Sequence, residues 1–378
     1  MELNVVNKES TKMSAALMRG ILHVDIAPSA ITPETLFGFA ERRNPKRAFL
    51  FVSRVLGKHI PVKPSIMQAS YESLAAQIPA DLPGPVLVIG MAETAVGLGA
   101  GVHRAYSATR PDTMYMVSTR HPVGDEIFAR FEEEHSHASA HLIHLPVDPE
   151  LREAMLNSRS LVLVDDEAST GKTFINLHRA LISAGLANVE RVVTCVLTDW
   201  SGDAVTNTIG ESASQVSLIS GSYRFIEDPE APLPEMPELG TVAVGQWPIE
   251  PLNDWGRLGV RAVEDTLAPG ITVVPGQRIM VIGTGEFVWK PFLLAERLER
   301  AGADVYFSST TRSPIALGHS IHHALSFSDN YGLGIVNFLY NVAPGQFDRV
   351  LICTETDVMA MPSCLVDALK AEVIVDER

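Results

Sequence analysis

The sequence is poor in cysteine and in positive charge, and it has no long apolar run. Its three cysteines (Cys195, Cys353 and Cys364) are too few and too far apart for a disulfide framework or a cysteine metal site. With 30 Lys and Arg against 45 Asp and Glu, the net charge is −15, which argues against nucleic acid as a partner. No run of about eighteen apolar residues occurs, and the start (MELNVVNKES) has no signal core. We therefore expect a cytoplasmic protein without a membrane partner.

The chain has the composition and the length of a globular protein with two domains. Hydrophobic residues make up 46% and charged residues 20% of its 378 residues, so each of two domains can bury its own core. Between 226 and 240 the composition changes to a run rich in proline and acids (EDPEAPLPEMPELG), which is typical of a linker. We therefore predict one domain over residues 1–235 and a second, smaller domain over residues 236–378.

Apolar runs of strand length alternate with helical patterns in both parts of the chain. This alternation predicts an α/β fold with a mostly parallel, doubly wound sheet, followed by a second smaller α/β domain. Ligands of such sheets bind where the parallel strands end. Residues 1–46 are polar and loosely patterned, with a short strand expected near 21–24 and a helix near 33–43. The other predicted strands are 48–52, 86–90, 115–118, 142–145, 161–164, 191–197, 278–282, 304–308, 334–340 and 349–353.

The most informative stretch is LVLVDDEASTGKT, residues 161–173. An apolar strand leads into Asp165 and Asp166, and a loop of small and hydroxyl-bearing residues then leads into a helix that ends at Gly185. Free backbone N–H groups at such a helix start bind phosphate, and two carboxylates take sugar hydroxyls or a hydrated magnesium ion. An ordinary turn with solvated acids is the alternative. The phosphate would be held by Ala168, Ser169, Thr170, Gly171, Lys172 and Thr173.

The phosphate loop of nucleoside triphosphatases is a competing interpretation, because the stretch ends in GKT. That motif, G-x-x-x-x-G-K-[ST], needs a glycine at position 166, where this chain has Asp166. A carboxylate at that point would repel the phosphates that the loop binds. This interpretation therefore ranks below a site for a phosphorylated sugar.

The stretch resembles the PRPP-binding signature of type I phosphoribosyltransferases, in which a hydrophobic strand leads into two acids and a 5′-phosphate loop. The resemblance implies Mg²⁺ as cofactor, held through Asp165 and Asp166 mostly by way of water. It also implies that Arg120 approaches the pyrophosphate of PRPP when a mobile loop closes. A helix of small residues that only packs on a sheet is the alternative for 90–106. The pyrophosphate loop would be Gly90, Met91, Ala92, Glu93, Thr94 and Ala95.

The same resemblance places the acceptor in a hood formed by the N-terminal segment, where solvated turns are the alternative. The mobile loop would be the polar stretch 121–140, which shows no sheet pattern. It departs from orotate phosphoribosyltransferases because no lysine occurs between Thr119 and Arg159. The histidines of this region (His135, His137, His141 and His144) fit no zinc spacing. The acceptor candidates are Arg54, Lys58, His59, Asp199 and Trp200.

Polar residues also stand at strand ends in the second half of the chain. They favour a second site with an unknown ligand, and ordinary solvated strand ends are the alternative. An arginine among hydroxyls suits a phosphate or a carboxylate. The residues of this second site would be Thr311, Arg312, Ser313, Asp329 and Asn330.

Together with the PRPP signature, TTRSP (310–314) and DNYGLGIVNFLYN (329–341) resemble one bacterial family. Its members are phosphoribosyltransferases with a C-terminal TRSP domain, encoded beside tellurium-resistance and stress-response genes. The resemblance implies a magnesium-dependent pentosyltransferase that joins PRPP to a nitrogenous base-like acceptor, in the biosynthesis of a nucleoside-like metabolite. Related enzymes imply a homodimer. Two alternatives stay open: a regulatory protein that binds PRPP or a nucleotide without turnover, and a main activity that lies in the C-terminal domain.

Overall fold

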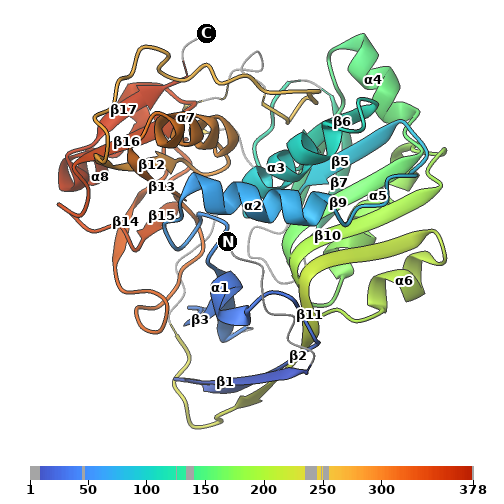
Figure 1. The fold of residues 1–378 in the computed structure, drawn as a ribbon, viewed down its shortest axis with the longest axis horizontal. Coiled ribbons are helices and arrows are strands. Elements are labelled where there is room, and N and C mark those ends of the chain that lie inside the picture. The colour runs from blue at the N-terminus through green and yellow to red at the C-terminus, as the bar shows by residue number, and fades with distance from the viewer. Residues whose placement is uncertain are drawn as a thin grey trace.

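The chain forms one mostly parallel and one entirely parallel sheet, and the helices of the two sheets pack against each other (Figure 1). The computed structural model describes residues 9–44, 47–124, 126–132, 140–234, 245–247, 249 and 255–376. The predicted domain boundary at 235/236 lies outside these ranges, as do His135 and His137. Among the described residues, no helix has both the length and the apolar character needed to cross a membrane.

The first sheet has seven strands, five of which form its parallel core. The sheet order is β1-β2-β11-β10-β9-β5-β6; the strands from β11 to β6 are parallel, and β2 pairs antiparallel with β1 and β11. This topology confirms the predicted mostly parallel α/β sheet. The strands are β1 (Thr11–Leu17), β2 (Gly20–Ile26), β5 (Val86–Gly90), β6 (Thr113–Val117), β9 (Ser160–Ala168), β10 (Arg191–Asp199) and β11 (Ala213–Glu227).

The second sheet is smaller and entirely parallel, in the order β13-β12-β16-β17. It confirms the expected second α/β unit. Its strands are β12 (Arg278–Gly283), β13 (Asp304–Ser309), β16 (Arg349–Thr354) and β17 (Glu372–Val375). Three antiparallel hairpins complete the strands: β3 (Phe37–Glu41) with β4 (Phe49–Ser53), β7 (Ile127–Glu132) with β8 (Ala140–His144), and β14 (Ala324–Ser328) with β15 (Val336–Tyr340).

Helices α2, α3 and α7 join the two sheets, and Figure 1 shows α2 and α7 side by side at the junction. The largest apolar core runs without a break through both sheets and these helices, and a separate apolar cluster lies within the C-terminal half. The α-helices are α1 (Pro33–Leu36), α2 (Pro64–Ala75), α3 (Val96–Ser107), α4 (Pro149–Leu156), α5 (Lys172–Ala184), α6 (Ala204–Ile209), α7 (Trp289–Arg300) and α8 (Ser363–Leu369), with a short 3₁₀ helix at Val358–Ala360.

Three expectations about these elements were wrong. The helix expected at 33–43 is a single turn, because 37–41 pairs with β4. The stretch 121–140, expected to lack sheet structure, contains β7 at 127–132, which pairs with β8. The strand expected to end at Val164 continues to Ala168, because β10 hydrogen-bonds alongside it beyond the apolar run. Pairing with a neighbouring strand therefore overrides the local polar pattern.

Helix α3 packs on β5 through glycines, which brings the two backbones close together. A Cβ added at Gly99 would lie 2.7 Å from the Cα of Gly90, and a Cβ at Gly90 would lie 2.9 Å from the carbonyl oxygen of Ala95. This close contact fixes the loop that joins β5 to α3.

We expect Gly99→Ala to lower the free energy of unfolding by about 1–3 kcal/mol, as overpacked cores do. Gly97→Ala in the same helix is the matched control, because its Cβ would have no neighbour nearer than 3.9 Å. This control should stay within about 0.5 kcal/mol of wild type, since alanine favours helix. Urea unfolding of the two variants tests the difference, and equal effects would contradict the close packing at Gly99.

Candidate functional site

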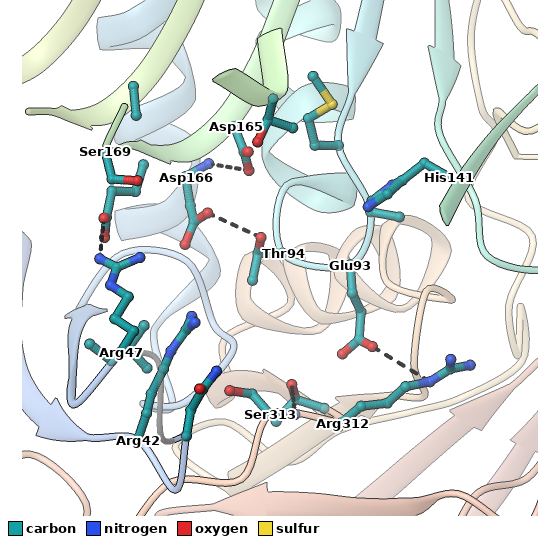
Figure 2. A pocket seen from close by; sticks show the side chains of 18 of the residues that line it. Arg42, Arg47, Glu93, Thr94, His141, Asp165, Asp166, Ser169, Arg312 and Ser313 are labelled. Carbon is teal, nitrogen blue, oxygen red and sulfur yellow. Dashed lines mark hydrogen bonds and ion pairs between the residues drawn. The ribbon is translucent and has the colours of Figure 1, made fainter. Parts of the chain in front are cut away.

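A pocket lies where the parallel strands of the first sheet end and the second domain meets them. It contains side chains from β9, from the loop after β5, from the segment around β3 and β4, and from the TTRSP segment (Figure 2). The residues that line it are Arg42, Asn44, Arg47, Leu50, His59, Met91, Ala92, Glu93, Thr94, Arg120, His141, Asp165, Asp166, Glu167, Ala168, Ser169, Thr170, Gly171, Thr173, Phe174, Thr311, Arg312, Ser313 and Pro314.

The two acids lie near the end of β9 and line the pocket, as Figure 2 shows. The backbone N–H of Asp166 donates to Asp165 Oδ1 at 2.9 Å, and Thr94 Oγ1 donates to Asp166 Oδ1 at 3.0 Å. Burial, and then the neighbouring Glu167 carboxylate, raise the pKa of Asp166. The acids therefore form a crowded anionic patch to which a cation would bind favourably.

The loop from 168 to 171 leads directly into helix α5. Its four residues line the pocket, so the N-terminal end of α5 lies next to the pocket. Gly171 has a φ of 71°, a left-handed conformation that favours glycine. A Cβ at this position would lie 2.5 Å from Val205 Cγ2, so any side chain would press on α6. The exposed Lys172 is not among the residues that line the pocket. The loop therefore presents its backbone and hydroxyls to the pocket, without the ammonium group of Lys172.

Six residues were predicted for the loop after β5. Residues 91–94 line the pocket, whereas Gly90 and Ala95 are not among the lining residues. The peptide bond between Ala92 and Glu93 is cis. The N–H of Ala92 donates to Ser118 Oγ at 2.9 Å, and Ser118 Oγ is 3.1 Å from His141 Nδ1. These contacts hold the loop against the segment that follows β6.

Glu93 is a buried carboxylate surrounded by cations. Its Oε1 is 2.7 Å from Lys58 Nζ, and its Oε2 is 4.0 Å from Arg120 Nη1 and 4.0 Å from Arg312 Nε. Burial alone would raise the pKa of Glu93, but Lys58, Arg312 and Arg120 lower it to about 2. The carboxylate is therefore charged at neutral pH.

Lys58 and His59 are neighbours in the sequence, but only His59 lines the pocket. Lys58 is outside the pocket lining and donates to the carbonyl oxygens of Thr310 (2.8 Å) and Gly285 (3.3 Å). His59 lines the pocket, and its Nε2 has no hydrogen-bond partner among the described residues. Burial lowers the pKa of His59 to about 3, so its imidazole is neutral. His59 therefore has an unsatisfied polar atom at the pocket.

Sequence reasoning missed a basic segment between β3 and β4. Arg42, Asn44 and Arg47 line the pocket, and Arg47 Nη2 contacts Glu167 Oε1 at 2.5 Å. The sequence signal was the density of basic residues in ERRNPKR, which was treated as part of a polar lead-in. Pairing of β3 with β4 brings this segment opposite the acids of β9.

The residues expected to form a second site lie in two different places. Thr311, Arg312 and Ser313 line the first pocket. Asp329 instead accepts hydrogen bonds from backbone N–H groups of its own loop, including Tyr331 at 2.9 Å. Asn330 donates to Thr354 Oγ1 and Thr356 Oγ1. The TTRSP segment thus belongs to the same site as the acids of β9.

Besides Lys58, three more acceptor candidates are not among the lining residues. Asp199 accepts hydrogen bonds from Ser201 and Gln215, and Trp200 stacks on Phe51 with ring centroids 4.7 Å apart. Arg54 is exposed. Asp199 is therefore held by local hydrogen bonds and Trp200 by ring packing, and neither side chain lines the pocket.

Burial lowers the pKa of His59 to about 3, and those of His103 and His121 to about 4. In the unfolded chain each of these imidazoles takes up a proton near pH 6.5. The contribution of the neutral imidazoles to the free energy of unfolding is therefore complete above that pH and is lost progressively below it. We expect the free energy of unfolding to fall by about 1.4 kcal/mol per pH unit for each of them below pH 6. Urea unfolding between pH 7.5 and 5 tests this. His103→Gln, away from the pocket, should reduce the slope, and an unchanged free energy down to pH 5 would contradict the prediction.

Comparisons with known proteins agree with the fold and the motifs. Residues 36–222 match the family model for a phosphoribosyl transferase, and residues 257–369 match that for the TRSP domain found C-terminal to it. No curated protein matches the sequence significantly. Solved structures that match part of the chain include adenine phosphoribosyl transferase from Trypanosoma brucei in complex with AMP, pyrophosphate and ribose-5-phosphate (12% identity, TM-score 0.35, covering 50% of this chain and 78% of that chain).

Two further solved structures show the same range of similarity. Adenine phosphoribosyltransferase from Rhodothermus marinus has 16% identity and a TM-score of 0.35, over 50% of this chain and 97% of that chain. Hypoxanthine phosphoribosyltransferase from Staphylococcus aureus has 13% identity and a TM-score of 0.25, over 43% and 77%. The two family matches cover β5, β6, β9 and β10 of the first sheet, β12, β13 and β16 of the second sheet, and the TTRSP segment. On that ground the chain belongs to the phosphoribosyl transferases with a C-terminal TRSP domain.

Proposed function

We propose that the protein is a magnesium-dependent phosphoribosyltransferase that joins PRPP to a nitrogenous base-like acceptor, in the biosynthesis of a nucleoside-like metabolite. The observation that carries this proposal is one pocket that combines the acid pair of β9, the start of helix α5 and four arginines. PRPP has a 5′-phosphate, ribose hydroxyls and a pyrophosphate, and the pocket offers a partner for each.

Charge distribution supports a polyanionic substrate. The whole chain has a net charge of −15, yet Arg42, Arg47, Arg120 and Arg312 all line this pocket. Guanidinium groups bind phosphate oxygens in pairs of parallel hydrogen bonds. Four arginines gathered at one pocket of an acidic protein therefore favour phosphate groups as ligands.

In the proposed reaction the protein mainly positions the substrate and stabilises the charge that develops on pyrophosphate. A ring nitrogen of the acceptor attacks the anomeric carbon of PRPP, the bond to pyrophosphate breaks, and pyrophosphate leaves with the electron pair. The backbone N–H groups of 168–171 would hold the 5′-phosphate, and Asp165 and Asp166 would accept hydrogen bonds from the ribose hydroxyls. Arg120 would stabilise the charge that develops on pyrophosphate.

The donor set fits Mg²⁺ held together with substrate. Within the described ranges, no three His, Cys, Asp or Glu side chains are grouped so that they could hold a metal ion by themselves. Magnesium usually keeps several waters and binds one or two carboxylates plus substrate phosphates, for which Asp165 and Asp166 are suited. Bound there, the ion would neutralise phosphate charge and offset the burial and the Glu167 carboxylate that raise the pKa of Asp166.

The acceptor would lie beside His59 and Asn44, in place of the earlier candidates Asp199 and Trp200. The neutral imidazole of His59 has a free hydrogen-bonding position at Nε2 among the described residues, which suits a ring nitrogen or a carbonyl group. A regulatory protein that binds PRPP without turnover is the second candidate. A homodimer remains the expected assembly.

The first experiment is calorimetric titration of PRPP with and without Mg²⁺, followed by a pyrophosphate-release assay against a panel of nitrogenous bases. We expect magnesium-dependent binding, and release with at least one base, because the pocket matches the groups of PRPP. Binding without release from any base would favour the regulatory protein. A protein that does not bind PRPP at all would contradict the proposal.

Replacing both Asp165 and Asp166 by Asn should slow pyrophosphate release at least about 100-fold, as for the loss of charged groups that stabilise a transition state. The melting temperature should change little, because neither acid belongs to the apolar core. Asp203→Asn is the matched control, since Asp203 is exposed and away from the pocket. Turnover at the wild-type rate in the double variant would remove both acids from the mechanism.

A further inference from the structure

We propose that Arg312, from the C-terminal TRSP domain, binds the pyrophosphate group of the substrate, so that the two domains form one active site. This inference rests on the proposed function and extends it to a residue outside the phosphoribosyl transferase domain. Figure 2 shows the Arg312 side chain extending toward Glu93 in the loop after β5.

The guanidinium of Arg312 is buried at the pocket with one nitrogen unsatisfied. Only 7% of Arg312 is exposed, and it lines the pocket. Its Nη2 is 3.3 Å from His121 Nε2, and its Nε is 4.0 Å from Glu93 Oε2. Its Nη1 has no hydrogen-bond partner in the part of the chain that the structure describes. A buried arginine with an unused donor beside an open pocket is arranged to bind an anion.

The charges around Glu93 do not balance within this cluster. Lys58 forms a close ion pair with Glu93 at 2.7 Å, which already matches the single carboxylate. Arg120 and Arg312 each approach the other carboxylate oxygen only to 4.0 Å. Because Lys58 already pairs with Glu93, the guanidinium of Arg312 adds positive charge at the pocket. A pyrophosphate group has the opposite charge and several acceptor oxygens, so it matches two guanidinium groups.

The TTRSP segment is held firmly by its own domain. Thr311 exchanges two backbone hydrogen bonds with Phe338 of β15, at 2.9 and 2.7 Å. Tyr340 OH donates to the carbonyl of Ser313 at 2.8 Å and accepts from the N–H of Ile315 at 2.8 Å. Arg312 therefore projects from a fixed backbone, so little ordering is needed when the anion binds.

The C-terminal domain also positions the second arginine of this cluster. Glu286 Oε1 accepts from the backbone N–H of Arg120 at 2.8 Å, and its Oε2 accepts from Thr119 Oγ1 at 2.5 Å. Arg257 Nη2 holds the same carboxylate at 3.2 Å. The domain thus supplies one guanidinium and fixes the backbone that bears the other.

The test is calorimetry on the full chain with Mg²⁺, using inorganic pyrophosphate and ribose 5-phosphate as separate ligands. Arg312→Gln should weaken pyrophosphate binding at least tenfold and leave ribose 5-phosphate binding within twofold of wild type. Arg300→Gln, a matched control with an exposed arginine in the same domain, should leave both affinities unchanged. Arg312→Lys should bind pyrophosphate at least threefold more weakly than wild type, because lysine lacks the planar fork of donors.

Two results would overturn the inference while the proposed function stands: unchanged pyrophosphate affinity in Arg312→Gln, or an equal loss of affinity for both ligands, which would indicate a structural role. Wild-type protein that binds neither ligand would contradict the proposed function itself. Melting temperatures show whether each variant folds. If Arg312→Gln does not fold, Arg312→Lys decides: selective loss of pyrophosphate binding supports the inference, and unchanged binding overturns it.

Discussion

The site depends on a buried ionic network that joins the two domains. Arg257 donates to Glu355 through both terminal nitrogens (2.7 and 2.8 Å) and also contacts Glu286, which holds the segment after β6. Burial alone would raise the pKa of Glu286, but neighbours led by His121 and Arg257 lower it to about 2. Such networks add little net stability, yet breaking one is costly, so they fix one arrangement of the parts they join. In this chain they fix the C-terminal domain against the strand ends that form the pocket.

Electrostatics explains why the pocket can contain both acids and arginines. Arg47 is paired with Glu167, while Glu93 lies among Lys58, Arg120 and Arg312. Arg47, Glu167 and Glu93 therefore each have an opposite charge nearby, which offsets much of the cost of removing them from water. The acid patch of β9 and the arginine cluster near Glu93 occupy different parts of one cavity, as Figure 2 shows. A substrate that carries both hydroxyls and phosphates would contact both parts.

Local motifs were predictable and distant contacts were not. The loop from 168 to 171 was found because strand, acids, small residues and helix follow one another within thirteen residues. The basic segment with Arg42 and Arg47 was missed because its role depends on the β3–β4 pairing. Trp200 was assigned to the acceptor on account of its place after a strand, whereas it is packed against Phe51. The sequence shows that a side chain follows a strand, but it does not show whether other side chains pack over that side chain.

The sequence by itself determined the two mostly parallel sheets, the loop of small residues before α5 and the family, because these follow from apolar periodicity and from contiguous motifs. Only the tertiary structure decided that TTRSP belongs to the pocket of Asp165 and Asp166 and not to a site of its own. The physical reason is the continuous core through α2, α3 and α7, which sets the position of one sheet relative to the other. Contacts of that kind join residues more than a hundred positions apart, and no local pattern in the chain records them.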